Sequence, residues 1–282
     1  MEPLMNAKPG MNAKPGTAAV FHQLHEGPQP LLLPNAWDAG SARLMESLGA
    51  KAVATTSAGV AWTHGYPDGN ALPVRLLVAT VATIARAIRV PLTVDIEAGY
   101  ADDPPAVEET VAKVVEAGAV GINIEDGAST PDLLCVKIER ARRAGDHFDV
   151  DLFVNARTDV YLRGLVPESE RVAETLARAR LYRNAGASGL FVPGLSAPEE
   201  IRAIAAGAGL PLNVMAWPGL PAAAELAQLG VRRLSAGSGI AQALWGKAAA
   251  LAGDFLKTGK SGPLGEGAMG YADINALFGQ RS

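Results

Sequence analysis

The sequence predicts an α/β protein that folds as an eight-stranded parallel (β/α) barrel of the TIM type, with additional helices at its C-terminus. Eight short apolar segments alternate with helical patterns along the 282-residue chain, as such a barrel requires. Four helical patterns end at a glycine that directly precedes the next apolar segment, namely Gly49, Gly118, Gly186 and Gly230. A glycine that ends a helix just before a buried strand is typical of a repeated α/β turn. A doubly wound open sheet is the alternative, but the Gly-x-Gly-x-x-Gly turn expected after its first strand is missing.

The expected strands and helices follow one another in the order that a barrel needs. Strands are expected over residues 31–33, 52–56, 91–97, 120–124, 152–156, 189–192, 212–215 and 233–235. Helices are expected between them, one ending near Gly49, others over about 72–88, 103–118, 131–144 and 168–185, and another opening at Pro198. The clearest helix begins at Asp103, which can cap it, with Pro104 in its first turn and a stripe of valines along one face.

The two ends of the chain differ from its middle. Residues 1–20 contain a tandem repeat of Met-Asn-Ala-Lys-Pro-Gly and are expected to form a flexible tail. Residues 21–282 are expected to form a single barrel domain, of which about 238–282 are a helical extension. Within this extension a long helix over 238–258 precedes apolar residues at helical spacing, from Tyr271 to Phe278. Such an amphipathic piece packs either on a partner subunit or on its own barrel, and the residues leave both open.

Composition restricts the classes of function. Hydrophobic residues make up 49% of the chain and charged residues 19%, which is enough apolar material to bury a sizeable core. The net charge of −4 and the pI of about 5.6 argue against a nucleic-acid partner. Cys135 is the only cysteine, so an internal disulfide framework is excluded and a reducing, cytoplasmic setting is expected. No apolar run reaches membrane-spanning length, so no membrane partner is expected.

Asp95 and Glu97 close the third expected strand. Because a strand alternates its faces with a period of two, the two carboxylates are expected to point the same way. Two like charges held side by side repel each other unless a positive charge lies near them, and a divalent cation is the usual solution. The alternative is a strand that ends in a solvated acidic turn, and this stretch alone does not decide between them.

The neighbouring strands favour the cation. In a parallel barrel the carboxyl ends of all strands share one face, where active sites form. Glu125 and Arg157 close the next two strands, one βα repeat apart each time, and Asn213 lies on the seventh strand. Several carboxylates beside an arginine suit an oxygen-loving cation and an anionic substrate. With no histidine in this set, Mg²⁺, or in its place Mn²⁺, is expected rather than zinc.

From about Leu31 to Gly246 the chain resembles the isocitrate lyase and phosphoenolpyruvate mutase superfamily. The motifs that support this resemblance are Thr56-Ser-Ala-Gly-Val60, Tyr66-Pro-Asp68, Asp95-Ile-Glu-Ala-Gly-Tyr100, Gly121-Ile-Asn-Ile-Glu-Asp126 and Asn155-Ala-Arg-Thr-Asp159. The resemblance implies a barrel whose eighth helix is exchanged between subunits, in a homo-oligomer of dimers that pair into tetramers.

The resemblance also implies roles for individual residues. Asp95 is expected nearest to Mg²⁺, with Glu97, Glu125 and Asp68 holding the metal largely through waters. Backbone N–H groups of Ser57, Ala58 and Gly59 are expected to hold a substrate carboxylate, because small residues let the backbone approach it. Arg157 is expected to face the developing oxyanion. The expected catalytic set is therefore Arg157, Glu125 and Asp68, and the expected substrate-binding set is Ser57, Ala58, Gly59, Arg157 and Asn213.

The chain departs from the superfamily where proton transfer is concerned. Lyases that cleave isocitrate or methylisocitrate have a cysteine-containing loop after the Glu-Asp pair, and here Glu125-Asp126 is followed by Gly127 without such a loop. Phosphonate-forming mutases have a lysine where this chain has Gly127, and Glu97 stands where aspartate is usual. Cys135 falls inside an expected helix and is interpreted as a packing residue.

Candidate acid–base groups are few. His64 and Tyr66 share a loop with Asp68, and each is either close to the site or a structural loop residue. The other histidines, His22, His25 and His147, are expected at the surface. The functional hypothesis is a Mg²⁺-dependent lyase that cleaves or forms a carbon–carbon bond of a small α-oxo or α-hydroxy di- or tricarboxylate through a pyruvate-like enolate. Alternatives are a phosphonomutase, an oxaloacetate or phosphoenol hydrolase, or a 2-oxo-acid-binding barrel without turnover.

Overall fold

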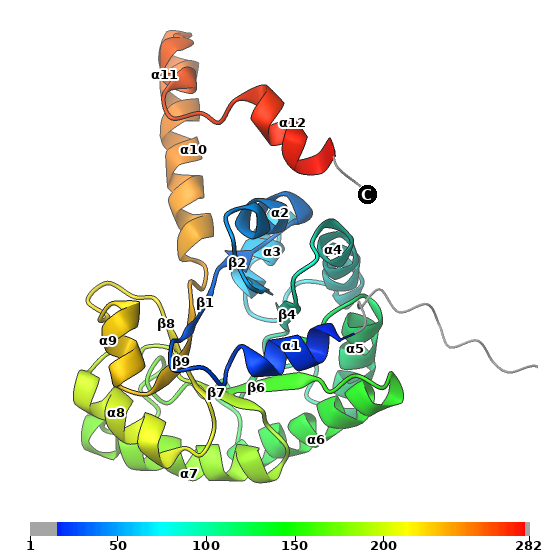
Figure 1. Cartoon of the computed structure of the whole chain (residues 1–282), viewed down its shortest axis with the longest axis vertical. Coiled ribbons are helices and arrows are strands. Elements are labelled where there is room, and N and C mark those ends of the chain that lie inside the picture. Colours follow the sequence, from blue (N-terminus) through cyan, green and yellow to red (C-terminus); the bar gives the residue numbers. More distant parts are fainter. Residues whose placement is uncertain (1–15, 280–282) are drawn as a thin grey trace, which may run out of the picture.

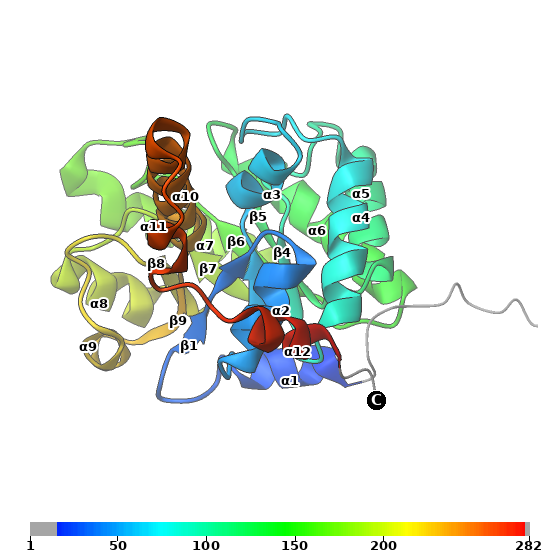
Figure 2. The same ribbon diagram turned by 90° about the horizontal axis from the view of Figure 1, so that it is seen from above.

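The protein is a parallel β-barrel surrounded by helices, as Figures 1 and 2 show. The computed structural model describes residues 16–279. Within them nine parallel strands form one sheet in the order β1-β9-β8-β7-β6-β5-β4-β3-β2. The strands are β1 (Leu31–Leu33), β2 (Asn35–Ala36), β3 (Val53–Thr55), β4 (Leu92–Asp95), β5 (Gly121–Glu125), β6 (Phe153–Arg157), β7 (Gly189–Phe191), β8 (Leu212–Met215) and β9 (Val231–Ser235).

The first strand of the barrel is divided at Pro34. Before the proline, β1 pairs with β9, and after it, β2 pairs with β3. Proline has no backbone N–H to donate, but its carbonyl still accepts from the Ala54 N–H at 3.1 Å. The segment 31–36 therefore joins the two ends of the sheet and nearly closes the ring. The parallel α/β barrel predicted from the sequence is confirmed, and the open sheet is excluded.

Helices cover the outside of the barrel. They are α2 (Ala39–Ser47), α3 (Ser57–Thr63), α4 (Val74–Ala87), α5 (Pro104–Glu116), α6 (Pro131–His147), the short 3-10 helix η1 (Glu168–Glu170), α7 (Arg171–Asn184), α8 (Pro198–Gly207) and α9 (Ala223–Gln228). Polar side chains fix several helix starts: Asp38, Asp103 and Thr130 each accept a backbone N–H from the first turn that follows. On α5 the valine stripe is fully buried, as its spacing predicts.

Helix α1 (Thr17–Gln23) closes the end of the barrel at which the strands begin. Phe21 is fully buried and packs edge-on against Phe153, with 5.2 Å between ring centroids. A Cβ on Gly121 would lie 2.8 Å from the Phe21 ring, so only glycine leaves room for it. His25 stacks on Phe153 at 4.1 Å and is 3% exposed. Burial, together with the charge of Arg233, lowers the pKa of His25 to about 3, so the ring is neutral.

Two expectations for this end need correction. Residues 17–20 belong to helix α1, although the sequence suggests a tail up to residue 20. His25 is a core residue rather than a surface one, because its ring packs against Phe153. The polar residues around it in the sequence gave no sign of this burial. The remainder of the expected tail, residues 1–15, lies outside the described residues.

The C-terminal helices leave the barrel. They are α10 (Gly239–Thr258), α11 (Gly262–Gly265) and α12 (Tyr271–Gly279). Figure 1 shows α10 rising away from the strands, and Ala241 is its only buried residue. Helix α12 returns toward α2, where Arg43 Nε donates to the Leu277 carbonyl at 2.8 Å. None of the helices described is both long and apolar enough to cross a membrane.

Candidate active site

The carboxyl ends of β4, β5 and β6 bring Asp95, Glu125 and Arg157 to one face of the barrel. Asp95 is the last residue of β4, and its own N–H donates to Thr55 Oγ1 at 2.9 Å. The Ser57 hydroxyl approaches Asp95 Oδ2 at 3.4 Å. Asp95, Glu125 and Arg157 thus converge as the βα repeat predicts, because Arg157 forms an ion pair with Glu125 and its charge also acts on Asp95.

Glu97 reaches the site by a route that differs from the predicted one. Strand β4 ends at Asp95, and Glu97 has a left-handed backbone with φ of 52°, which is unusual for a residue with a side chain. Its N–H donates to Asp95 Oδ1 at 3.1 Å, so the two acids are neighbours through a tight turn rather than through strand alternation. Strained backbone of this kind is characteristic of functional sites.

The Glu97 carboxylate is held between two loops. Its Oε2 accepts from the backbone N–H of Asn70, which belongs to the loop that carries Asp68. Its Oε1 is buried and makes no hydrogen bond of ordinary geometry with the residues described, although the Tyr100 hydroxyl lies close to the carboxylate and lowers its pKa. Asp68 itself is exposed, and its charge raises the pKa of both Asp95 and Glu97, so it lies near these two acids.

The expected carboxylate cradle is the first turn of helix α3. Thr56 caps this helix, and Ser57, Ala58 and Gly59 are buried at its start. First-turn N–H groups have no partner within their helix and attract anions. A Cβ on Gly59 would lie 2.7 Å from Thr56 Cγ2 and 3.0 Å from Trp37 Cβ, so a glycine is required for this close packing.

Arg157 is clamped by two carboxylates. Its Nη1 lies 2.6 Å from Glu125 Oε2, while its Nε and Nη2 donate to the two oxygens of Asp159 at 2.7 and 3.1 Å. Its guanidinium also lies 5.9 Å from the centre of the Phe191 ring. Charge-assisted bidentate contacts of this kind fix orientation strongly. Sequence reasoning gave Asp159 no role, although its place two residues after Arg157 was the available signal.

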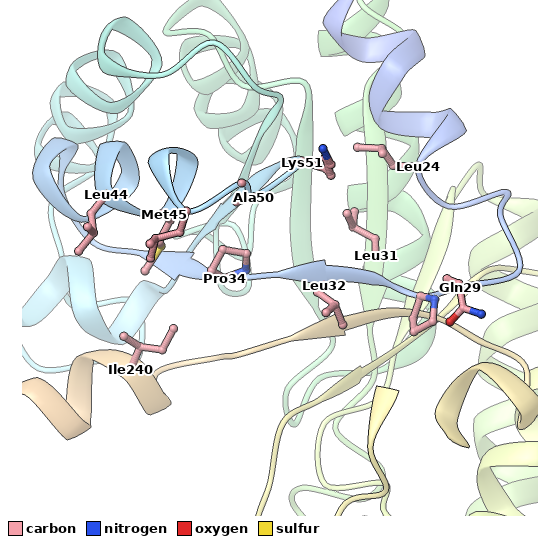
Figure 3. A pocket seen from close by; sticks show the side chains of 13 residues that line it. Leu24, Gln29, Leu31, Leu32, Pro34, Leu44, Met45, Ala50, Lys51 and Ile240 are labelled. Carbon is pink, nitrogen blue, oxygen red and sulfur yellow. The ribbon is translucent and has the colours of Figure 1, made fainter. Parts of the chain in front are cut away.

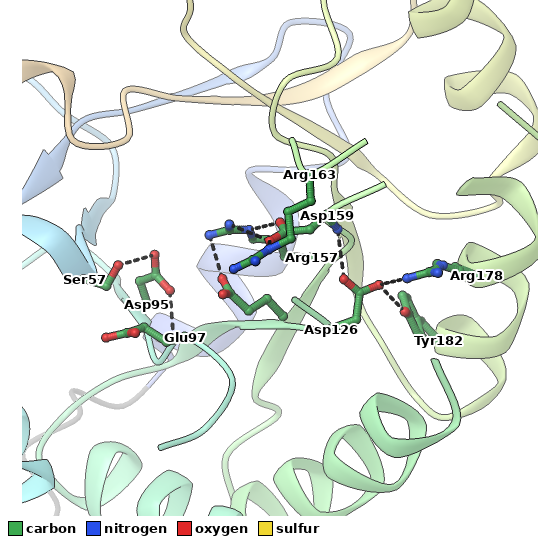
Figure 4. Close-up of polar contacts among 10 residues, drawn as sticks. Ser57, Asp95, Glu97, Asp126, Arg157, Asp159, Arg163, Arg178 and Tyr182 are labelled. Carbon is green, nitrogen blue, oxygen red and sulfur yellow. Dashed lines mark hydrogen bonds and ion pairs between the residues drawn. The ribbon is translucent and has the colours of Figure 1, made fainter. Parts of the chain in front are cut away.

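Asp126 supports this clamp from behind. Its Oδ1 accepts the Asp159 N–H at 2.9 Å, and its Oδ2 accepts from Arg178 at 2.8 Å and Tyr182 at 2.6 Å, both on helix α7. The two acids of the Glu-Asp pair therefore have separate duties. Glu125 contacts the Arg157 guanidinium, whereas Asp126 joins the ends of β5 and β6 to α7, as Figure 4 shows.

Asn213 does not join the cavity group. It is 1% exposed, and its Oδ1 accepts from Asn155 Nδ2 at 3.0 Å. Its Nδ2 donates to the Val214 carbonyl and to Ser235 Oγ at 2.7 and 3.1 Å. All of its polar atoms are thus used inside the barrel, where Asn155 also bonds Asn123. The structure places this expected substrate ligand in the barrel core.

Burial has a larger effect on the pKa values of the carboxylates of the site than the positive charge of Arg157. Burial raises the pKa of Asp95 even though Arg157 acts against this shift. Burial likewise raises the pKa of Glu97, and that of Glu125 to about 8. Together with the unpaired Glu97 Oε1, these shifts indicate a place for a cation, and the all-oxygen donor set fits Mg²⁺. Among residues 16–279 no group of three or more His, Cys, Asp or Glu side chains is arranged to hold a metal ion directly.

Known proteins with a similar sequence and fold identify the family to which the chain belongs. The family profile described as phosphoenolpyruvate phosphomutase matches residues 21–256. An uncharacterised protein of Mycobacterium tuberculosis (strain ATCC 25618 / H37Rv) is 37% identical over 222 residues, covering 77% of this chain and 81% of that protein. The chain belongs to the phosphoenolpyruvate mutase/isocitrate lyase superfamily. An oxaloacetate decarboxylase of Bradyrhizobium sp. (strain ORS 278) is 31% identical over 187 residues, or 62% of each chain.

Solved structures of the superfamily superimpose on most of the chain. A crystal structure from Burkholderia cenocepacia J2315, to which phosphonomutase activity has been ascribed, is 44% identical, with a TM-score of 0.80 over 84% of this chain and 99% of that one. Phosphonopyruvate hydrolase in complex with oxalate and Mg²⁺ shares the fold, with 22% identity and a TM-score of 0.82 over 93% and 95% of the two chains. Superfamily relatives therefore bind Mg²⁺ and small carboxylates.

The acid–base loop of the superfamily lyases is absent. Only residues 126–130 separate β5 from α6, and the turn is closed by the Ser129 N–H donating to the Asp126 carbonyl at 2.8 Å. Cys135 is half-buried on α6, as expected of a packing residue. His64 Nε2 hydrogen bonds with Thr80 Oγ1 at 2.8 Å, and Tyr66 packs on the core. Both are structural in this conformation.

Proposed function

We propose that this protein is a Mg²⁺-dependent lyase-type enzyme that cleaves or forms a carbon–carbon bond of a small 2-oxo or 2-hydroxy di- or tricarboxylate through a pyruvate-like enolate. The observation that supports this most strongly is the convergence of Asp95, Glu97 and Glu125 with Arg157 beside the start of helix α3. In a complex with a 2-oxo acid, the buried acids would hold the cation, the fixed arginine would face the oxo oxygen, and the N–H cradle would hold the carboxylate.

The metal would be held by Asp95, Glu97, Glu125 and Asp68, in part through water. When bound, a Mg²⁺ ion supplies Lewis-acid stabilisation of negative charge that develops on oxygen. The N–H groups of Ser57, Ala58 and Gly59 orient the carboxylate next to the oxo group. Burial of this cradle excludes water and strengthens each hydrogen bond to the anion.

Arg157 stabilises the oxyanion of the enolate. Asp159 keeps its guanidinium in place even when the Glu125 carboxylate turns toward a cation, because two of the three contacts come from Asp159. Such fixed donors need no reorganisation during the reaction and are usually the largest catalytic contribution.

Decarboxylation of a four-carbon 2-oxo dicarboxylate is the form of this chemistry that needs the fewest groups. The bond to the distal carboxylate breaks, CO₂ leaves, and the electron pair becomes the enolate, which then takes a proton from solvent. Aldol-type cleavage would in addition need a base to remove a hydroxyl proton, and the loop that supplies one in relatives is absent here. The oxaloacetate decarboxylase relative supports the same choice.

A substrate panel tests the proposal. Oxaloacetate, methylisocitrate-like acids, dimethylmalate and phosphonopyruvate are incubated with protein and Mg²⁺, and pyruvate or glyoxylate release is measured. We expect pyruvate from oxaloacetate, lost on addition of a chelator. Turnover of phosphonopyruvate alone would instead support the phosphonomutase or hydrolase alternative, which the Burkholderia structure favours and Gly127 disfavours. Binding without turnover of any compound would support the non-catalytic barrel.

We further propose that α10 is exchanged between subunits of a homo-oligomer. In a regular barrel a helix after the last strand covers the first strand, but here Leu32 on β1 is 55% exposed. A cavity of about 610 Å³ lies beside it, lined mainly by apolar residues of β1 and α2 together with Ile240 (Figure 3). The exposed apolar residues of α10 are Ile240, Leu244, Trp245, Leu251, Phe255 and Leu256.

The second subunit's α10 would fill this cavity and bury both surfaces. Light scattering should give a dimer or tetramer for the native chain. Leu244→Asp should shift it toward monomer, whereas Lys247→Gln on the same helix, which also makes the net charge one unit more negative, is the matched control. A monomeric native protein would contradict the exchange.

A further inference from the structure

A second guanidinium lies beside Arg157 at the edge of the site. Arg163 Nε donates to Asp159 Oδ2 at 2.9 Å, and Arg157 Nη2 donates to the same oxygen at 3.1 Å. Two guanidinium groups that share one carboxylate oxygen are separated by no more than the length of a small diacid. Figure 4 shows Arg163 next to Asp159 and Arg157.

The two arginines differ in how much of their bonding capacity is used. The Arg157 side chain is 17% exposed, and its Nε, Nη1 and Nη2 all contact carboxylates. The Arg163 side chain is 51% exposed, and its Nε contact with Asp159 is the one hydrogen bond it makes with the residues described. A guanidinium has five N–H donors, so Arg163 keeps four that are open to a ligand.

The backbone beneath Arg163 is fixed. It sits in the turn that follows β6, in which the Arg163 N–H donates to the Asp159 carbonyl at 2.9 Å and the Leu165 N–H to the Val160 carbonyl at 3.2 Å. Asp159 and Val160 are fully buried. A side chain on such a base loses less conformational entropy when it binds a ligand than one on a mobile loop.

The charge balance of this corner changes when a cation is present. Arg157 and Arg163 are offset by Asp159 and Glu125 in the structure. If Glu125 turns toward a metal, Asp159 alone faces two guanidinium groups, and one positive charge is left for an anion. The exposed donors of Arg163 are where that anion finds hydrogen bonds.

We propose that Arg163 forms a second carboxylate subsite, which orients the distal carboxylate of a bound dicarboxylate while helix α3 and Arg157 bind the 2-oxo acid end. Because the Arg163 side chain is half-exposed, water screens this contact, and the guanidinium returns to Asp159 and solvent when that carboxylate leaves as CO₂. This inference rests on the proposed function and narrows its substrate class to dicarboxylates. A guanidinium and a carboxylate form two parallel charge-assisted hydrogen bonds, which is the geometry that the free Nη atoms of Arg163 offer.

Matched ligands test the subsite. Malate and lactate are both 2-hydroxy acids, and malate adds the distal carboxylate. Oxalate can chelate a metal ion but has no separate distal carboxylate. Binding of each is measured by calorimetry at fixed Mg²⁺ in the native protein, in Arg163→Gln and in Arg180→Gln, an exposed arginine on α7 that serves as control. The native protein should bind malate about fivefold more tightly than lactate, the upper end for an ion pair with a half-exposed arginine.

Arg163→Gln should remove that preference and leave oxalate affinity within about threefold, whereas Arg180→Gln should change neither. An unchanged malate-to-lactate ratio in Arg163→Gln would overturn the subsite, and so would an equal loss for oxalate and malate, since Arg163 would then act only through Asp159 and Arg157. Oxalate that fails to bind even the native protein would instead contradict the proposed function, and the subsite would fall with it.

Discussion

The buried carboxylate of Asp159 offers a sharp test of how the site is held together. Asparagine has the same shape but no charge, and in Asp159→Asn it would face Arg157 and Arg163 across the contacts of 2.7 to 3.1 Å. Removing one partner of a buried ion pair costs about 3–5 kcal/mol when the other charge is left alone. Here Glu125 remains 2.6 Å from Arg157, so we expect the lower end, a loss of about 3 kcal/mol in the free energy of unfolding.

The functional loss in Asp159→Asn should be larger than the loss of stability suggests. The Arg157 guanidinium would keep its Glu125 contact and at most one neutral hydrogen bond to the new amide oxygen. A displacement of about 1 Å in a catalytic group can cost about a hundredfold in rate. We therefore expect kcat/KM for oxaloacetate to fall about 100-fold at a temperature where the variant is fully folded. Asp151→Asn, which changes an exposed ion pair at the opposite end of β6, is the control. A kcat/KM within threefold of the native value would refute the role of Asp159 as the clamp of Arg157.

Three further predictions concern the cradle, the metal and the core. Gly59→Ala places a methyl group 2.7 Å from Thr56 Cγ2. This variant should lower the free energy of unfolding by about 1–3 kcal/mol and weaken the binding of oxalate. Gly246→Ala, at a position with open space around it, should change neither quantity. The pKa of Glu125 is raised from 4.5 to about 8 in the metal-free protein, so Mg²⁺ must displace a proton from Glu125 below that pH. The affinity of the protein for Mg²⁺, measured by calorimetry, should therefore rise toward pH 8 and then level off. An affinity that stays constant from pH 6 to 8 would contradict this. Phe21→Ala should cost about 3–5 kcal/mol in urea unfolding because it opens the closed end of the barrel, and a loss below about 1 kcal/mol would show that α1 is not part of the core.

The fold and most of the site were predictable because their signals are local and periodic. Strand ends one βα repeat apart necessarily meet at one face of a parallel barrel, which is why Asp95, Glu125 and Arg157 converge as expected. Glycine at the ends of four helices marked the α/β turns for the same reason.

The remaining features depend on contacts that are distant in sequence. Asn213 lies on the expected strand, but Asn155 and Ser235 take up its polar atoms inside the barrel, and no local pattern reveals such partners. His25 becomes a core residue only because Phe153 packs against it. Glu97 lies next to Asp95 through a left-handed turn, which the sequence does not distinguish from a continued strand.

The most direct test of the central claim is pyruvate release from oxaloacetate, with and without Mg²⁺, by the native protein, Asp95→Asn and Asp146→Asn. Asp146 is an exposed acid on α6 far along the chain from the strand ends, so it controls for the loss of one charge. We predict Mg²⁺-dependent turnover in the native protein and in Asp146→Asn, and a loss of about 100-fold or more in Asp95→Asn, since the acid that we propose to lie nearest to the cation is gone. Equal turnover by Asp95→Asn and the native protein, or turnover that a chelator does not affect, would contradict the metal-assisted enolate site.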